Sequence, residues 1–201
     1  MSLIVFSHAN SFPASTYRVM FAELERRGFT VRAIEKFGHD PRHPVTPNWP
    51  HLVDELYEFA EAEGVKAGEP AWLVGHSLGG MIGPAYALKY PQHVLTLGLW
   101  STAAFRTEDD SAKVKGVVAA MRSKGIPQVL EALKDRWFTP EFGQRRPDVI
   151  ERRMQQVIDT DPEVFLSVFD IYAETEMGPW LHEITAPAQI ITGENDGGCN
   201  P

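Results

Sequence analysis

The chain has 201 residues, enough for one well-buried core and too few for two independent domains of ordinary size, so we expect one domain with an insertion. Its 19 basic and 27 acidic residues give a formal charge of −8, and the basic residues are scattered. Such a chain would repel a phosphate backbone, so we do not expect nucleic acid as a partner. Cys199 is the only cysteine, which excludes an internal disulfide and a thiolate metal cluster within one chain.

Membrane insertion and secretion are also not expected. The sequence has no apolar run long enough to span a bilayer, and its first residues lack the basic region, apolar stretch and cleavage site of a secretory leader. We therefore expect a cytoplasmic protein without a membrane partner. The sequence does not indicate an oligomeric state.

Apolar runs alternate with helical patterns along the chain, which is typical of a parallel sheet covered by helices. Five runs predict buried strands, at residues 3–6, 29–34, 71–75, 94–100 and 188–192. The fold class we predict is α/β, a doubly wound parallel sheet.

Helices are predicted where apolar residues recur at three- and four-residue spacing, at residues 17–24, 52–60 and 78–90. Ser15 and Thr16 are expected to cap the first helix, and Asn48 the second, because their side chains suit that position. Pro84 is expected to bend the third, since it removes one backbone hydrogen bond.

Residues 104–183 show a different pattern, with helical segments broken at Gly125, Pro140 and Pro162 and no convincing strand. We interpret this region as a helical cap inserted into a core made of residues 1–103 and 184–201.

The pentapeptide Gly75-His76-Ser77-Leu78-Gly79 lies between a predicted strand and a predicted helix. The G-x-S-x-G spacing suits a serine on a sharp, strained turn, because the flanking glycines let neighbouring backbone pass without a β-carbon clash. Such a turn lifts the Ser77 hydroxyl above the sheet and leaves the Leu78 amide free to face an oxyanion. We predict that Ser77 is a nucleophile; the alternative is a glycine-rich turn without chemistry.

The sequence resembles the α/β-hydrolase superfamily over nearly its whole length. The resemblance lies in VFSHANSFP (5–13), LVGHSLGGM (73–81) and PAQIITGENDGG (187–198). It implies the strand order 2-1-3-4-5, in which the loops after the first and third strands border the crevice where such sheets bind ligands. It also implies that the final strand and helix of the fold are missing from these 201 residues.

The family's His-Gly-X loop, which supplies a second oxyanion amide, corresponds here to His8-Ala9-Asn10, with alanine in place of glycine. Asn10 is the first candidate for that amide and Ser11 the second. We also place His8, Ser11 and His76 around the substrate, with the His76 side chain pointing away from the Ser77 hydroxyl.

Gly193-Glu194-Asn195-Asp196 follows the last predicted strand and looks like the family's G-x-x-D, whose aspartate orients the catalytic histidine. Asp196 is therefore the predicted acid in preference to Glu194. The alternative is a solvated turn, since asparagine, aspartate and glycine are common turn formers.

The family would place its histidine after this aspartate, but all seven histidines precede it. We expect that the 201 residues are a fragment lacking the base, and that as written they are nearly inactive, because losing the base of a triad costs on the order of a millionfold in turnover. His39 and His43 were weighed as metal ligands, but Pro41 and Pro44 would break a helix that aligned them, so no metal is expected.

The function we predict is hydrolysis of a small carboxylic ester or lactone through an acyl-enzyme, without metal, nucleotide or organic cofactor. The cap resembles that of enol-lactone hydrolases at residues 135–142 and 160–165, and its aromatic residues, Phe138 and Trp180 among them, are expected to line a pocket; the alternative is that they pack the cap on itself. Alternative functions are carbon–carbon bond hydrolysis, a cofactor-free perhydrolase, and a non-catalytic member of the fold.

Overall fold

The computed structural model describes residues 2–44 and 49–199 of the chain. The predicted cap residue Asn48 lies outside the described residues. All five predicted strands are present, and they form one parallel sheet in the order β2-β1-β3-β4-β5, as predicted. Their bounds are β1 Leu3–Ser7, β2 Thr30–Ala33, β3 Ala71–His76, β4 Val94–Trp100 and β5 Ala188–Ile191.

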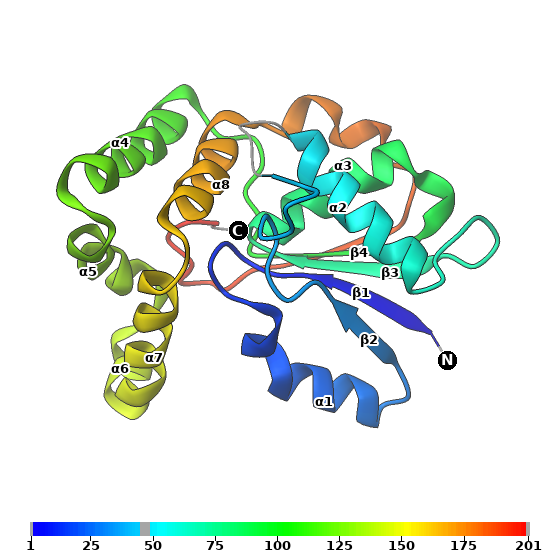
Figure 1. Ribbon diagram of the computed structural model, residues 1–201, viewed down its shortest axis with the longest axis horizontal. Coiled ribbons are helices and arrows are strands. Elements are labelled where there is room, and N and C mark those ends of the chain that lie inside the picture. The colour runs from blue at the N-terminus through cyan, green and yellow to red at the C-terminus, as the bar shows by residue number, and fades with distance from the viewer. Residues whose placement is uncertain (1, 45–48, 200–201) are drawn as a thin grey trace.

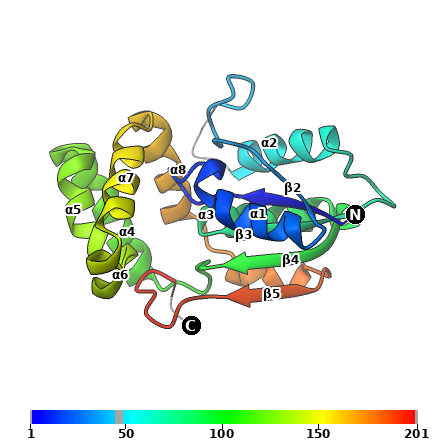
Figure 2. The same ribbon diagram turned by 90° about the horizontal axis from the view of Figure 1, so that it is seen from below.

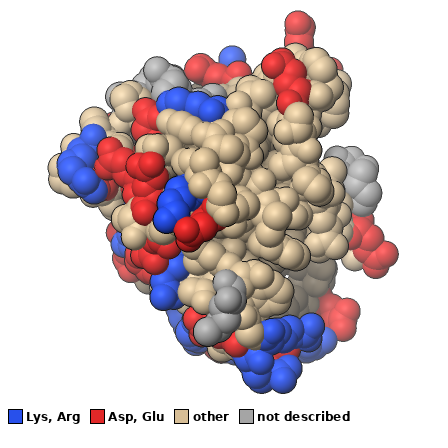
Figure 3. All heavy atoms as spheres, turned by 90° about the vertical axis from the view of Figure 1, so that its right-hand side faces the viewer, with Lys and Arg blue, Asp and Glu red and all other residues tan. Residues whose placement is uncertain are grey.

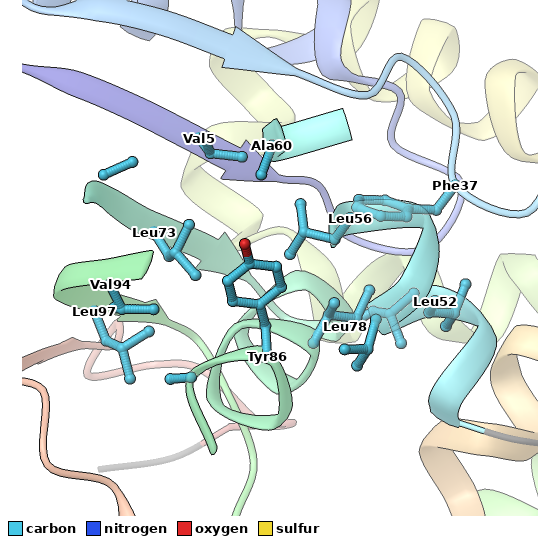
Figure 4. Packing of buried hydrophobic residues seen from close by; sticks show 14 of the residues in the cluster. Val5, Phe37, Leu52, Leu56, Ala60, Leu73, Leu78, Tyr86, Val94 and Leu97 are labelled. Carbon is cyan, nitrogen blue, oxygen red and sulfur yellow. The ribbon is translucent and has the colours of Figure 1, made fainter. Parts of the chain in front are cut away.

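The sheet is covered on both faces because successive side chains of a strand point to opposite sides. Ile4 and Phe6 of β1 pack with the helix α1, Arg18–Arg26, whereas Val5 packs with α2, Trp49–Ala62, and α3, Leu78–Lys89. Figure 1 shows α1 on one face of the sheet and α2 and α3 on the other. Figure 4 shows Tyr86 of α3 on the face of the sheet that α2 and α3 cover, packed among residues of β3 and β4.

The start of α1 differs from the prediction. The chain first makes the short 3-10 helix η1, Ala14–Tyr17, and neither Ser15 nor Thr16 caps α1. The reason is a competing partner: the Ser15 hydroxyl donates to the Glu35 carboxylate at 2.6 Å, and the Ser15 amide donates to the same carboxylate at 3.1 Å. Glu35 follows β2, so this contact is not visible in local sequence.

A helical region connects β4 to β5, with breaks at the predicted glycine and prolines. It consists of α4 Glu108–Lys124, α5 Ile126–Trp137, α6 Pro140–Arg145, α7 Pro147–Ile158, α8 Pro162–Glu174 and the 3-10 helix η3 Gly178–Glu183; a further short 3-10 helix, η2 Pro91–His93, precedes β4. Figures 1 and 2 both place α4 to α7 beside the carboxyl ends of the strands, with α8 between them and the sheet.

Helices α4 to α8, the predicted cap, have a core of their own, formed by residues such as Met121, Leu130 and Phe165. Helix α8 takes part in both cores, because its Val168 and Ile171 belong to the cluster between the sheet and helices α2 and α3. This shared helix is what joins the two packing units. The division into residues 1–103 with 184–201 and residues 104–183 stays a prediction.

None of the described helices is both long and apolar enough to cross a membrane. Figure 3 shows the face at the amino ends of the strands, opposite the cap, where acidic and basic side chains interleave around an uncharged centre.

Candidate active site

Ser77 sits on a strained turn between β3 and α3. Its φ angle is 52° and its ψ angle −113°, a conformation that residues with a β-carbon rarely adopt. A β-carbon on Gly75 would lie 2.1 Å from the carbonyl oxygen of Gly79, and one on Gly79 would lie 2.0 Å from that of Ser7. The glycines at both positions are therefore required by close backbone contact, as the motif predicts.

Two segments present unused backbone donors next to this turn. Leu78 is the first residue of α3, where an amide has no partner inside the helix. In the loop after β1, the Phe12 amide donates to the Ala9 carbonyl at 3.0 Å, and Ser11 has a φ angle of 59°. The amides of Asn10 and Ser11 donate no hydrogen bond to another described residue. Both proposed oxyanion amides are thus available.

These segments meet at one hollow, as the strand order implies. Its walls come from the loop after β1, from Leu78, from the loop after β2 and from α8, and include His8, Asn10, Ser11, Phe37, Val164 and Val168. The hollow has a volume of about 20 Å³, room for roughly one water molecule. The Ser11 hydroxyl is buried at this place without a hydrogen-bond partner among the described residues.

A second hollow of about 240 Å³ adjoins the first, and His39 and Val164 belong to the walls of both. It lies between the loop after β2 and the start of α8, and Asp40 and Glu163 stand on its rim. The larger hollow is the more open of the two, and Ser77 itself belongs to the walls of neither.

His8 is buried, and both of its ring nitrogens are engaged. Nδ1 donates to the Ala9 carbonyl at 2.7 Å, and Nε2 accepts from the Phe37 amide at 2.9 Å. Burial lowers the pKa of His8 to about 4, so the ring is neutral and suits this pair of bonds. His8 therefore ties the loop after β1 to the loop after β2, and it has no nitrogen left to act as a base.

His76, the residue before the serine, bonds through Nδ1 to the Tyr17 hydroxyl at 2.7 Å. The same hydroxyl accepts from the Ala9 amide at 3.2 Å. Burial lowers the pKa of His76, while the nearby Asp196 carboxylate acts in the opposite direction. Tyr17 was predicted only as an apolar helix residue, and no local motif marks its hydroxyl as a link between two loops.

Asp196 lies in the loop after β5, at the same edge of the sheet as Ser77. Its Oδ1 accepts from the amides of Gly198 at 2.9 Å and Cys199 at 2.8 Å. Partial burial raises its pKa, but these amides, a contact with Ser101 and the nearby His76 outweigh that effect, so the pKa lies below its ordinary value. Glu194, the other candidate acid, is exposed.

The cap aromatics mostly pack on one another. Phe138 is half-buried and stacks on Phe142, with ring centroids 5.9 Å apart, and Phe165 packs on Phe169 at 5.4 Å. Trp180 is half-buried in η3, and neither Phe138 nor Trp180 belongs to the walls of the two hollows. The smaller residues Thr160, before α8, and Val164 and Val168, on α8, take that place. No sequence pattern distinguishes them from other small residues of the same region.

The histidines weighed as metal ligands have other partners: His43 bonds to Glu58 at 3.0 Å, and His39 bonds to the Phe37 carbonyl at 3.0 Å. In residues 2–44 and 49–199, histidine, cysteine and carboxylate side chains form no group of three or more that would hold a metal ion.

The sheet order and the serine on the β3–α3 turn define the α/β-hydrolase fold, and solved structures of that fold superimpose on the chain. An enol-lactonase from Burkholderia xenovorans LB400 matches with a TM-score of 0.82 and 23% identity, over 96% of this chain and 72% of that one. A thermophilic esterase from Thermogutta terrifontis matches with a TM-score of 0.81 and 19% identity, over 100% and 74%.

A family model described as serine aminopeptidase, S33, matches residues 2–201, so the chain belongs to this family and is a hydrolase. Among characterised relatives, 3-oxoadipate enol-lactonase 2 of Acinetobacter baylyi is 24% identical over 195 residues, 96% of this chain and 71% of the relative. Proline iminopeptidase of Saccharolobus solfataricus is 25% identical over 218 residues, 96% of this chain and 69% of the relative.

Proposed function

We propose that the protein is a serine hydrolase that cleaves a small carboxylic ester or lactone through an acyl-enzyme. The Ser77 oxygen attacks the carbonyl carbon, and the amides of Leu78 and Asn10 donate to the oxygen that becomes negative. The Ser77 proton passes to a base and from it to the alcohol oxygen as the ester C–O bond breaks; water then attacks the acyl carbon, one of its protons returns to the Ser77 oxygen, and the acid is released. Asp196 is the proposed acid that would orient the base, and His8 and His76, which are engaged by other groups, do not fill the role of that base.

The observation that carries this proposal is the strained Ser77 turn beside unused amides. A φ angle of 52° costs free energy, on the order of 1–3 kcal/mol, and such strain persists mostly where function needs it. Asn10 and Leu78 belong to walls of the same hollow, so an oxygen bound there can reach donors from both segments.

The walls of the two hollows support the substrate class. Phe37, Val164 and Val168 give the inner hollow an apolar side, and its volume of about 20 Å³ leaves room for little more than a carbonyl oxygen of the substrate. The outer hollow, of about 240 Å³, has room for the remainder of a small substrate. Similarity to proteins named as an enol-lactonase and an esterase points the same way. Ser11, whose buried hydroxyl has no hydrogen-bond partner within residues 2–44 and 49–199, is the proposed contact for a second substrate oxygen.

We further propose that residues 1–201 alone turn over substrate slowly. His8 and His76 are engaged by other groups, and His93 bonds through Nδ1 to the Tyr86 hydroxyl at 3.0 Å in the core. An unassisted serine hydroxyl is a weak nucleophile.

The test combines labelling and substrate profiling. A fluorophosphonate probe should label the wild-type protein slowly and the Ser77→Ala variant not at all, while Ser123→Ala, at an exposed cap position, should label like wild type. Prolonged assays with 4-nitrophenyl esters and 4-nitroanilides of the same acyl groups should show ester cleavage first. Equal labelling of the Ser77→Ala variant would refute the nucleophile, and preferential anilide cleavage would favour a peptidase instead.

A further inference from the structure

The Tyr17 hydroxyl joins the two segments that carry the proposed oxyanion donors. It accepts from the Ala9 amide at 3.2 Å, and it is hydrogen-bonded to Nδ1 of His76 at 2.7 Å. Ala9 directly precedes Asn10, and His76 directly precedes Ser77. The Tyr17 oxygen therefore bonds to both loops. In each loop the bonded residue directly precedes one with a proposed role in the reaction.

The ring of Tyr17 is itself fixed by packing. It lies against Phe6 with centroids 4.6 Å apart, at 6.2 Å from Phe21, and edge-on to His76 at 5.8 Å. Phe6 lies on β1, inside the sheet. Because the Tyr17 ring packs on Phe6, the position of the Tyr17 hydroxyl is fixed relative to the sheet. Its position can then set the separation of the two loops.

We propose that Tyr17 is a positioning residue that sets the distance between the amides of Asn10 and Leu78, and so shapes the oxyanion hole. This inference rests on the proposed function. The physical reason is that donors aimed at a developing charge must be fixed before the reaction, and a misplacement of about 1 Å costs on the order of a hundredfold in rate.

The surroundings favour this arrangement at ordinary pH. Burial raises the pKa of Tyr17, so the hydroxyl keeps the hydrogen that it donates, although Arg153 of α7 acts in the opposite direction. Burial lowers the pKa of His76, with Asp196 from the loop after β5 opposing, so the ring is neutral and can accept at Nδ1 when its hydrogen is on Nε2. Arg153 and Asp196 are the charged groups facing this pair from other elements.

The chain offers a matched control for the test. Tyr86 of α3 also bonds through its hydroxyl to Nδ1 of a histidine, His93, at 3.0 Å. It lies in the core between α3 and the sheet (Figure 4), away from the loops that carry Ala9 and His76. The variants Tyr17→Phe and Tyr86→Phe each remove one buried hydroxyl. Their melting temperatures show how much of any change is loss of stability alone.

The first measurement is the rate at which a fluorophosphonate labels Ser77. Tyr17→Phe should slow it about 10- to 100-fold, whereas Tyr86→Phe should stay within about twofold of wild type. Equal slowing in both variants, or none in Tyr17→Phe, would overturn the proposal.

The second measurement is NMR and does not depend on catalysis. In Tyr17→Phe the pKa of the His76 ring should rise, because the hydroxyl that stabilises the unprotonated Nδ1 is gone, and the amide signals of Asn10, Ser11 and Leu78 should move. In Tyr86→Phe they should not. If wild type is not labelled but these signals move, the proposed function fails and the positioning role stands. If they do not move, the positioning role fails.

Discussion

At the scale of single residues, backbone strain marks the candidate site. Ser11, Ser77, Ser101 and Phe105 are the described non-glycine residues with positive φ angles. The three serines follow β1, β3 and β4, whose carboxyl ends form one edge of the sheet. Strained residues persist where the surrounding structure holds them, most often at functional sites, so their gathering at one edge supports the assignment.

The buried ring of His8 gives the first prediction. Burial lowers its pKa to about 4, and Nε2 accepts from the Phe37 amide, a bond that needs the neutral ring. The unfolded chain binds a proton near pH 6.5, so stability should fall as the pH drops from about 6.5 to 4, by up to about 3 kcal/mol. An NMR titration of the His8 ring should show protonation near pH 4; a midpoint near 6.5 would contradict the buried, doubly bonded ring.

Glu55 of α2 gives a prediction of the opposite sign. Its carboxylate is buried and accepts from the Gly38 amide at 2.9 Å, and burial raises its pKa to about 7. The folded protein then holds a proton that the unfolded chain has lost, so stability should fall as the pH rises from about 4.5 to 7, by about 2–3 kcal/mol.

The Glu55→Gln variant isolates this effect, because the amide oxygen still accepts from Gly38 but cannot ionise. Urea unfolding at pH 5 and pH 8 should show a smaller loss of stability with rising pH in Glu55→Gln than in wild type. Parallel pH dependence in the two proteins would show that Glu55 does not change its protonation in this range.

At the scale of elements, α3 shows why the sequence around Ser77 is so rich in glycine. A β-carbon on Gly79 would lie 2.0 Å from the carbonyl oxygen of Ser7, since α3 starts directly over the end of β1. One on Gly83, a turn further along, would meet only Leu97 Cδ2 at 3.7 Å, an ordinary contact. The close contact is therefore confined to the turn that presents Ser77.

This difference predicts two opposite results in one helix. Gly79→Ala should destabilise the protein by about 3 kcal/mol or more, because backbone must move. Gly83→Ala should stabilise it by up to about 1 kcal/mol, because alanine favours a helix. Denaturant unfolding of both variants measures this, and a neutral Gly79→Ala would mean that α3 and β1 are not in close contact.

At the scale of the whole molecule, the sequence predicts what local pattern determines and misses what distant contacts determine. Apolar runs predicted the five strands, and the elbow motif predicted the Ser77 turn. The predicted cap by Ser15 failed because Glu35 competes for its hydroxyl, and Tyr17 was not recognised because its partner His76 lies 59 residues away. Each miss is a contact between elements that no local pattern records.

The contacts between cap and core are of this distant kind, and they hold the loop after β1. The Asn10 side chain donates to the Phe165 carbonyl at 3.2 Å, and Phe12 packs edge-on against Trp137 with ring centroids 5.6 Å apart. The buried Arg153 donates to the Thr16 hydroxyl. The loop with the proposed oxyanion amides is thus shaped by the cap as well as by the sheet.

Val164 of α8 stands where the cap meets both hollows, which gives the last prediction. The proposed route from solvent passes between Val164 and His39, because both residues belong to the walls of the outer and inner hollows. A Val164→Trp substitution adds bulk at this boundary, at a cost of about 1–3 kcal/mol from overpacking. It should slow labelling of Ser77 by a bulky fluorophosphonate at least about tenfold more than labelling by diisopropyl fluorophosphate, since only the larger probe needs the full width of the passage.

The matched control is Ile158→Trp, at a cap position that is 41% exposed and outside both hollows. It should leave the ratio of the two labelling rates unchanged, because added bulk on the outer surface narrows nothing. If Val164→Trp also leaves the ratio unchanged while the protein remains folded, substrate reaches Ser77 by another path, and the outer hollow has no part in binding.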